Sequence, residues 1–148
     1  MQNIESPVLF DTIATHCGHQ IGTMTLNDPN ALNALSVDMC KLMANQLTKW
    51  ATDDNIVAIL LKGSGEKAFC AGASFDELIS IKDFETGKTF FSGFANVINA
   101  MRKSPKLIIA RIHGKAVGGG VGIACAADYT FATENASVKL SELAVGIG

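Results

Sequence analysis

The stretch that decides the fold is residues 113–128, HGKAVGGGVGIACAAD, in which the glycines Gly118 to Gly120 follow an apolar run from Leu107 to Ile112. The apolar run is β-prone, and the small residues after the glycines are typical of a tightly packed helix. Because the turn carries no side chains, a ligand oxygen can approach the main chain closely, and the helix N-terminus adds about half a positive charge. The stretch therefore predicts a strand-turn-helix junction that forms an anion hole.

A second junction of the same kind lies earlier in the chain. The run from Phe69 to Ala73 leads into Ser74, and Glu77 follows three residues later, which is the pattern of a capping box. We expect a helix to start at Ser74, with Gly72 and Ala73 at its mouth. Taken alone, a glycine-rich junction fits equally well a place where a helix packs closely on a sheet. The presence of two junctions favours a site.

The remaining patterns predict an α/β fold made of right-handed βαβ units. Continuous apolar runs at 56–61 and 107–112 predict strands buried on both faces, and apolar residues at helical spacing predict helices over 36–51 and 83–103. If the two strands share a sheet, both junctions emerge at one edge. The amides of Ala73 and Gly119 can then converge on one oxygen, as in an oxyanion hole. A hairpin over 8–26 and strands at 129–133 and 137–140 complete the expected elements.

Three ordered motifs resemble the crotonase superfamily, also called the enoyl-CoA hydratase/isomerase family. Residues 69–78 resemble its first signature, residues 114–128 resemble its second, and residues 27–35 resemble its first loop. The resemblance covers nearly the whole chain. It implies a crotonase-type spiral of ββα units, of which residues 1–148 form the N-terminal core without the C-terminal helices that close the acyl pocket and build trimers.

By this resemblance the chain is an enzyme that acts on an acyl-CoA thioester. Ala73 and Gly119 would supply the two amides that bind the thioester oxygen and stabilise an enolate. The resemblance assigns substrate binding to five further residues, with coenzyme A as part of the substrate and no metal or other cofactor. These are Asn30, Ala31, Ala71, Phe75 and Gly118.

The acid-base residues distinguish this chain from typical hydratases of the family, which carry two glutamates. The first of these positions is occupied here by Gly122, and the second, twenty residues later, by Glu142. A single carboxylate can take a proton at one carbon and return it at another, so double-bond isomerisation is slightly favoured. Enoyl-CoA hydration and a silent acyl-CoA-binding protein are the alternatives. On its own, Glu142 fits a solvated surface carboxylate better than a catalytic group.

Composition narrows the partners of the chain. Its 148 residues are 48% hydrophobic with a formal net charge of −2, and the basic residues are scattered. Nucleic acid and membranes are therefore not expected as partners. Four cysteines at unpatterned spacing and no secretory signal indicate reduced thiols in a cytoplasmic protein. A homotrimer or a dimer of trimers is implied by the resemblance alone.

Two weaker patterns complete the sequence reading. Residues 63–68 formally fit a dinucleotide fingerprint, but no helix is expected to begin at Ala68, which disfavours a nicotinamide site. The aromatic stripe formed by Phe84, Phe90, Phe91 and Phe94 is expected to lie in the core, with part of it available to the acyl pocket.

Overall fold

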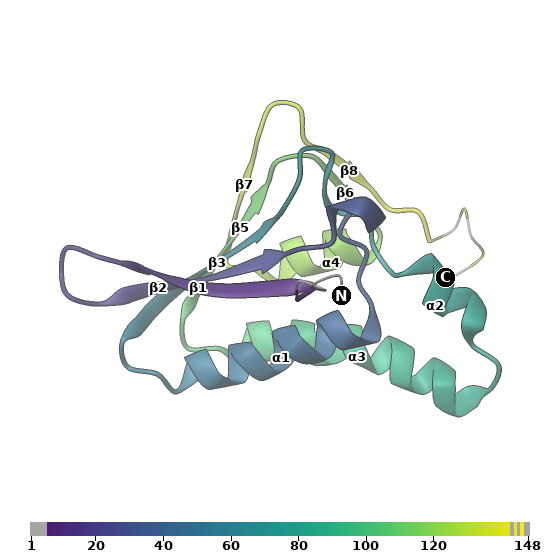
Figure 1. Cartoon of the computed structure of the whole chain (residues 1–148), viewed down its shortest axis with the longest axis horizontal. Coiled ribbons are helices and arrows are strands. Elements are labelled where there is room, and N and C mark those ends of the chain that lie inside the picture. The colour runs from purple at the N-terminus through teal and green to yellow at the C-terminus, as the bar shows by residue number, and fades with distance from the viewer. Residues whose placement is uncertain (1–5, 143, 145, 147–148) are drawn as a thin grey trace, which may run out of the picture.

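A five-stranded sheet in the order β1-β2-β3-β5-β7 forms the main layer of the structure (Figure 1). The computed structural model describes residues 6–142, 144 and 146. β1 and β2 form the expected antiparallel hairpin, and the other neighbouring strands pair in parallel. The five strands are β1 (Val8–Ala14), β2 (Gln20–Leu26), β3 (Ile56–Gly63), β5 (Leu107–Ile112) and β7 (Tyr129–Ala132).

A second, smaller sheet carries the two glycine junctions. It consists of β4 (Ala68–Cys70), β6 (Lys115–Val117) and β8 (Ser137–Lys139), in the order β4-β6-β8 and with parallel pairing throughout. The sequence pattern did not predict β4 or β6 as strands, because three residues are too few to show a period. The strands that lead directly into the junctions are therefore β4 and β6, not β3 and β5 as expected.

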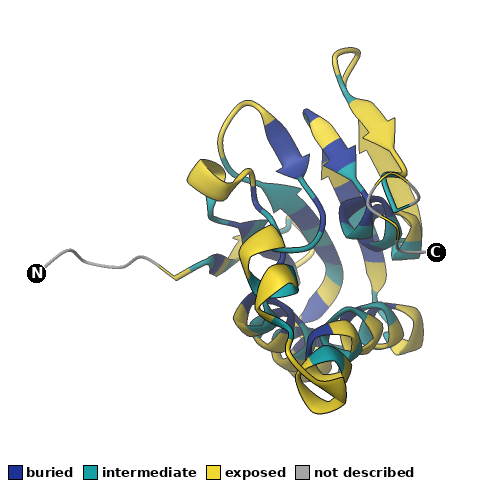
Figure 2. Ribbon diagram, turned by 90° about the vertical axis from the view of Figure 1, so that its right-hand side faces the viewer, coloured by how far each residue is buried: buried dark blue, intermediate teal, exposed yellow. Residues whose placement is uncertain are grey.

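Two long helices cover one face of the main sheet. Figure 1 shows α1 (Val37–Ala51) and α3 (Phe84–Lys103) lying side by side below it. α1 begins where the Ser36 hydroxyl accepts a hydrogen bond from Met39 N–H, and α3 begins with a capping box between Asp83 and Thr86. Figure 2 shows that buried positions gather on the strands and on the inner sides of the helices. The largest fully buried side chains include Met24, Met39, Met43, Leu47, Ile59, Phe69 and Ile108.

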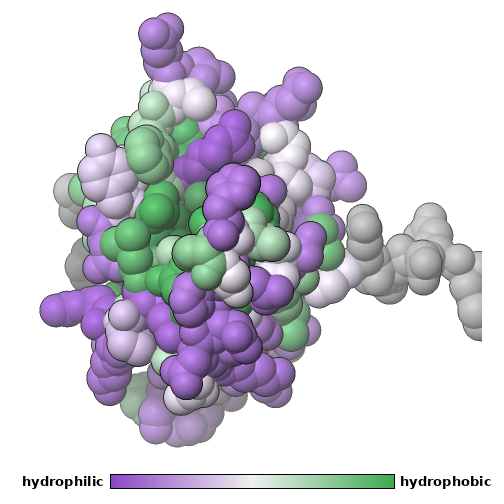
Figure 3. Space-filling view, turned by 90° about the vertical axis from the view of Figure 1, so that its left-hand side faces the viewer, coloured by the Kyte–Doolittle hydropathy of each residue, from purple (hydrophilic) through white to green (hydrophobic). Residues whose placement is uncertain are grey.

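The other face of the main sheet is exposed in this structure. Side chains along β3 and β5 alternate between buried and open positions, and Val57 and Leu107 are 40% and 50% exposed. The prediction that both strands are buried on both faces is therefore wrong for the described residues, because α1 and α3 cover only one side. A groove on the sheet is lined by apolar residues such as Ile13, Leu60 and Phe131. Figure 3 shows apolar side chains gathered on one side of the molecule among hydrophilic ones.

Three shorter helices connect the layers. η1 (Pro29–Ala31), α2 (Phe75–Ser80) and α4 (Gly119–Ala126) lie in the loop and junction regions that the sequence singled out. Ala68 belongs to a strand, so the helix that a dinucleotide fingerprint requires does not begin there. The prediction that the aromatic stripe lies in the core is only partly right. Phe90 is buried and Phe94 is half-buried, but Phe84 and Phe91 are exposed because α3 turns them away from α1 and the sheet.

Candidate active site

The first junction joins β4 to α2 through Gly72 and Ala73. Gly72 has a φ of +96°, a conformation that favours glycine because a Cβ would be strained there. Ser74 caps the following helix, since its hydroxyl accepts from Glu77 N–H at 3.4 Å. The Glu77 carboxylate in turn accepts from Val37 N–H at 2.8 Å, which ties α2 to the start of α1. The expected N-cap is therefore present, but the expected capping box is only half formed. Ser74 N–H donates to Leu35 O instead of to the Glu77 carboxylate, which is bound to Val37 N–H.

The second junction joins β6 to α4 at Gly118. Its φ is +51°, and no side chain caps the helix at this position. The first N–H groups of an α-helix have no partner within the helix, so Gly119 N–H at the first position of α4 is open to an acceptor. Gly118 N–H donates to the carbonyl of Lys139 at 2.9 Å, which anchors the junction to β8.

The two junctions meet because β4 and β6 are neighbouring parallel strands. A Cβ placed on Gly72 would lie 2.8 Å from Val117 O and 3.5 Å from Gly119 N. A Cβ placed on Gly119 would lie 3.9 Å from Ala73 N. The structure thus brings the two residues predicted to form the hole to within a few ångströms of each other, and glycine is required for the backbones to come this close.

The direction of the Ala73 amide follows from the segment on its other side. Leu35 N–H donates to Gly72 O at 2.7 Å, and Ser74 N–H donates to Leu35 O at 2.8 Å, so Leu35 and Ala73 form a parallel bridge. In such a bridge the residue between the two bonded groups directs its own N–H and C=O to the opposite side. Within the described part of the chain, no backbone acceptor is assigned to the N–H of Ala73 or Gly119.

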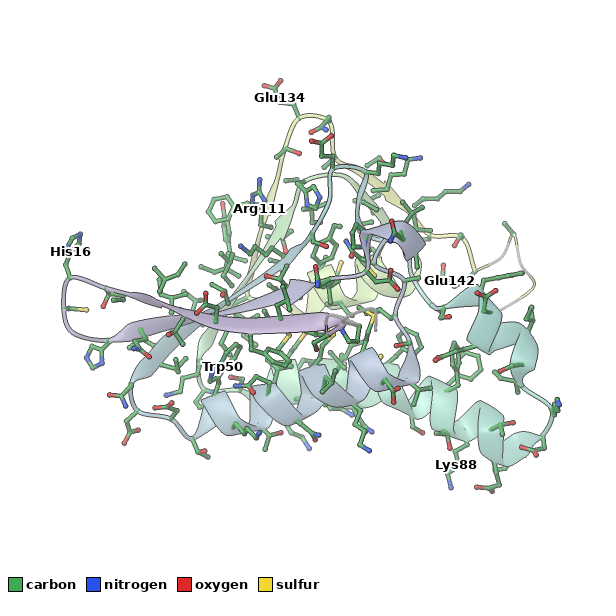
Figure 4. All side chains as sticks on the ribbon, viewed as in Figure 1. His16, Trp50, Lys88, Arg111, Glu134 and Glu142 are labelled. Atoms are coloured by element: carbon green, nitrogen blue, oxygen red, sulfur yellow. The ribbon has the colours of Figure 1, made fainter. Side chains whose placement is uncertain are left out.

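Glu142 lies at the N-terminal end of α4. The position of a Cβ on Gly118 would be 3.2 Å from Glu142 Oε1 and 3.5 Å from Ser141 Oγ. The Glu142 side chain is half-buried. It comes from the segment after β8, on the side of the molecule away from the hairpin tip that carries His16 (Figure 4). A carboxylate at this place can move a proton next to an oxygen held by the two amides.

The position that carries a second glutamate in typical hydratases is open. Among the described residues outside α4 itself, a Cβ on Gly122 would contact Ile98 Cδ1 alone, at the ordinary distance of 3.8 Å. The wall of the site next to Gly119 is formed by Phe94, whose Cε1 would be 3.0 Å from a Cβ on Gly119. Phe94, on α3, therefore forms one side of the site. In the sequence, the aromatic stripe was the feature that suggested this role.

The other predicted binding residues fall in different surroundings. Asn30 lies in the exposed η1 turn and lines a pocket together with Ser64 and Lys67. Ala31 is exposed in the same turn. Ala71 N–H donates to Leu32 O at 3.0 Å. Phe75, the first residue of α2, is 62% exposed, and Gly118 is buried beside Glu142.

The titratable thiols differ in their surroundings. Desolvation by burial, with a contribution from Glu77, raises the pKa of Cys40 to about 12, and burial raises that of Cys70 to about 12 as well. All four cysteines are free thiols. No group of three metal-ligating side chains occurs in the described residues, and no described helix is both long and apolar enough to cross a membrane.

Comparison with known protein families identifies relatives of this chain. The family model described as enoyl-CoA hydratase/isomerase matches residues 21–148. Human mitochondrial 3-hydroxyisobutyryl-CoA hydrolase is 37% identical over 131 residues, which cover 85% of this chain and 33% of the hydrolase. The short-chain-enoyl-CoA hydratase of Clostridium acetobutylicum is 34% identical over 128 residues, which cover 86% of this chain and 49% of that enzyme.

Solved structures agree with this match. An enoyl-CoA hydratase from Bacillus anthracis superposes with a TM-score of 0.88 at 30% identity, covering 96% of this chain and 53% of that one. An enoyl-CoA hydratase/carnithine racemase from Magnetospirillum magneticum gives 0.88 at 26% identity, with 97% and 52% covered. The chain thus spans a third to a half of the length of these relatives and has the N-terminal core of their fold. It belongs to the enoyl-CoA hydratase/isomerase family, the crotonase superfamily.

Proposed function

We propose that this chain forms the active site of an acyl-CoA enzyme in which Ala73 and Gly119 N–H bind the thioester oxygen and Glu142 transfers the proton. The observation that carries the proposal is the meeting of the two junctions, with a Cβ position on Gly119 only 3.9 Å from Ala73 N. Two fixed amide donors stabilise the negative charge that develops on a thioester oxygen when the neighbouring carbon loses a proton. Glu142 would serve as the base, because its half-buried carboxylate lies beside Gly118, the residue before the Gly119 amide.

The reaction that we favour is migration of a double bond. Gly122 supplies no second carboxylate, and one base is sufficient to remove a proton from one carbon and return it to another. Addition of water to a 2-enoyl-CoA is easier with two carboxylates, one to activate the water and one to protonate the carbon. No metal or redox cofactor enters this scheme, and coenzyme A takes part as a portion of the substrate.

Thioester hydrolysis is the second candidate, and the relatives favour it. Mitochondrial 3-hydroxyisobutyryl-CoA hydrolases from human and cattle are 37% and 36% identical to this chain. A hydrolase would use the same oxyanion hole for a tetrahedral intermediate, with Glu142 activating a water molecule. The space at Gly122 is compatible with such a water, since in the described part of the chain Ile98 Cδ1 is the one neighbouring atom outside α4 within 4 Å of a Cβ there.

Further parts of the proposal rest on the family alone. Asn30, Ala31, Ala71 and Phe75 would contact the coenzyme A part of the substrate. A trimeric assembly, a role in fatty acid metabolism and a cytoplasmic location also belong to the proposal. Because some relatives are mitochondrial, fractionation of the source cells is the measurement that tests the cytoplasmic location.

The decisive experiment incubates the protein separately with a 3-enoyl-CoA, a 2-enoyl-CoA and a saturated acyl-CoA and follows the products by mass. A shift of the double bond without a mass change supports isomerisation, whereas a gain of one water on the 2-enoyl-CoA supports hydration. Release of free coenzyme A from the saturated ester supports hydrolysis. Binding of all three esters without turnover would replace the proposal by the silent binding protein.

The variant Gly122→Glu separates the candidates further. A Cβ on Gly122 makes only an ordinary contact of 3.8 Å with Ile98 Cδ1, so we expect the variant to fold and to gain hydration of the 2-enoyl-CoA. If the parent already hydrates that substrate rapidly and the variant isomerises as before, the preference for one-carboxylate chemistry is wrong.

A further inference from the structure

A buried asparagine, Asn33, lies behind the first junction and has no part in the chemistry proposed above. Its side chain is 0% exposed, and its φ is +55°, in the left-handed region that asparagine tolerates better than most residues. A fully buried amide is expected to be hydrogen-bonded. The hydrogen-bond partners of the Asn33 amide show which segments it holds in place.

The Asn33 side chain connects two loops. Its Nδ2 donates to the carbonyl oxygens of Ser64 and Ala68, at 2.9 and 3.0 Å, at the two ends of the turn between β3 and β4. Its Oδ1 accepts from Asp28 N–H at 2.9 Å, and its own N–H donates to Asp28 O at 2.7 Å. The asparagine therefore fixes the loop that carries η1 to the turn that leads into β4.

The backbone on both sides of Asn33 holds the junction itself. Ala71 N–H donates to Leu32 O at 3.0 Å, and Leu35 exchanges hydrogen bonds with Gly72 and Ser74. Residues 32–35 thus lie along residues 71–74 as a short parallel strand, with Ala73 opposite Leu35. This pairing directs Ala73 N–H away from Leu35 and toward Gly119.

The end of β3 packs closely against the Asn33 side chain. A Cβ on Gly63 would lie 2.9 Å from Asn33 Nδ2 and 2.6 Å from Phe69 O. The end of β3 therefore has to be glycine for the amide to reach the turn. Residues 32–35 are therefore held in place by the Asn33 side-chain hydrogen bonds, by the backbone pairing with residues 71–74 and by the close packing at Gly63.

We propose that Asn33 is a positioning residue for the oxyanion hole: by tying residues 28–35 to the β3–β4 turn, it sets where Ala73 N–H points. This inference rests on the proposed function, because it assigns to Ala73 the role of a donor to the thioester. Hole donors must lie 2.7–3.1 Å from the oxygen, so a small shift of the supporting loop weakens the transition state more than it weakens binding.

The test compares Asn33→Gly with the parent protein. Glycine adopts the left-handed φ without strain, so the substitution removes the side-chain hydrogen bonds and little else. We expect kcat to fall about 10- to 100-fold with KM changed less than about threefold. The matched control is Asn27→Gly in the same loop, which removes one exposed hydrogen bond from Asn27 Nδ2 to Ser6 O and should leave both constants unchanged.

The second readout is the carbonyl stretch of bound butyryl-CoA labelled with carbon-13 at the thioester, recorded by difference infrared spectroscopy. The hole in the parent should lower this frequency relative to free butyryl-CoA, and Asn33→Gly should return it toward the free value. A merely structural role would lower the melting temperature without moving the frequency. Asn33→Ser, which buries no charge and also removes the donors to Ser64 O and Ala68 O, decides the question if the glycine variant does not fold.

The outcomes separate this inference from the proposed function. If the parent shows no frequency shift on binding, the oxyanion hole is wrong and the role of Asn33 falls with it. If the parent shows the shift and the folded Asn33 variants retain both the shift and kcat, the hole stands and only the positioning role is overturned. Loss of the shift in the variants, with Asn27→Gly like the parent, supports the inference.

Discussion

The substitution Gly72→Ala tests how closely the two junctions must approach. A Cβ at this position would lie 2.8 Å from Val117 O, whereas ordinary contacts begin at 3.4 Å. Because the Cβ is held rigidly by the backbone and Val117 O is itself a backbone atom, the segments carrying Ala73 and Gly119 must separate by about 0.6 Å, the difference between those distances. An alanine at a φ of +96° also strains the folded state by about 1–2 kcal/mol.

The expected effect on catalysis is larger than the effect on folding. A donor at about 2.9 Å from the oxygen would move to about 3.5 Å, beyond a useful hydrogen bond. Losing one hole donor entirely costs about 100- to 1,000-fold in kcat, so a partial loss should cost about 10- to 100-fold. The assay is kcat on whichever thioester the protein converts, together with the free energy of unfolding from denaturant titration.

Gly18→Ala is the matched control, because it separates backbone strain from the clash. Gly18 has a φ of +84° at the hairpin tip, and no atom of the described residues lies within 4 Å of its Cβ position. Gly18→Ala should therefore lose only the part of the free energy of unfolding that is due to backbone strain, and it should keep the kcat of the parent. If Gly72→Ala also keeps kcat within about threefold while both variants show the strain, the approach of the two junctions is not what binds the thioester oxygen.

Two further predictions concern groups outside the site. Cys17 is exposed, and a hydrogen bond with the Thr15 hydroxyl lowers its pKa, whereas burial raises the pKa values of Cys40 and Cys70 to about 12. Mass spectrometry of iodoacetamide-treated protein should therefore find Cys17 modified first. Earlier labelling of either buried thiol would contradict the described packing. Hydrogen bonds from the N–H and hydroxyl of Thr86 hold the pKa of Asp83 below its usual 3.8. The ionised Asp83 therefore stabilises the fold at neutral pH, and this contribution is lost as the pH falls through the lowered pKa. Denaturant titration should find Asp83→Asn less stable than the parent at pH 7 and equal to it in strong acid; an equal difference at both pH values would exclude the charge as the cause.

The sequence predicted the parts of the fold that long patterns determine. The spacing of apolar residues in α1 and α3 and the antiparallel hairpin β1–β2 were expected and are present. Such elements span two or more turns or a full strand pair, so their periodicity is visible in the sequence alone.

The parts that sequence analysis missed depend on contacts between distant segments. β4 and β6 are three residues each and exist because they pair with each other and with β8. Asn33 lies within the motif over 27–35 and had no role assigned from the sequence; its partners on the β3–β4 turn give it one. The exposed faces of β3 and β5 were also missed, because an apolar strand does not indicate how many layers cover it.

The candidate site was predicted more completely than the sheets around it. Ala73 and Gly119 came from the two glycine junctions and Glu142 from the family resemblance, and the structure places Ala73 near Gly119 and Glu142 beside Gly118. Their chemical roles stay predictions. The sequence predicted that part of the aromatic stripe could line the acyl pocket, but it did not identify Phe94, because the spacing does not specify which ring turns inward.

The central claim is that Glu142 moves a proton at the carbon beside a thioester held by the two amides. The most direct measurement is the incorporation of deuterium from heavy water into a 3-enoyl-CoA, followed by mass for the parent, Glu142→Gln and the exposed control Glu134→Gln (Figure 4). We expect the parent and Glu134→Gln to incorporate deuterium at equal rates, and Glu142→Gln to lose about 100-fold or more while still binding the ester. Incorporation by Glu142→Gln at the rate of the parent would contradict the account.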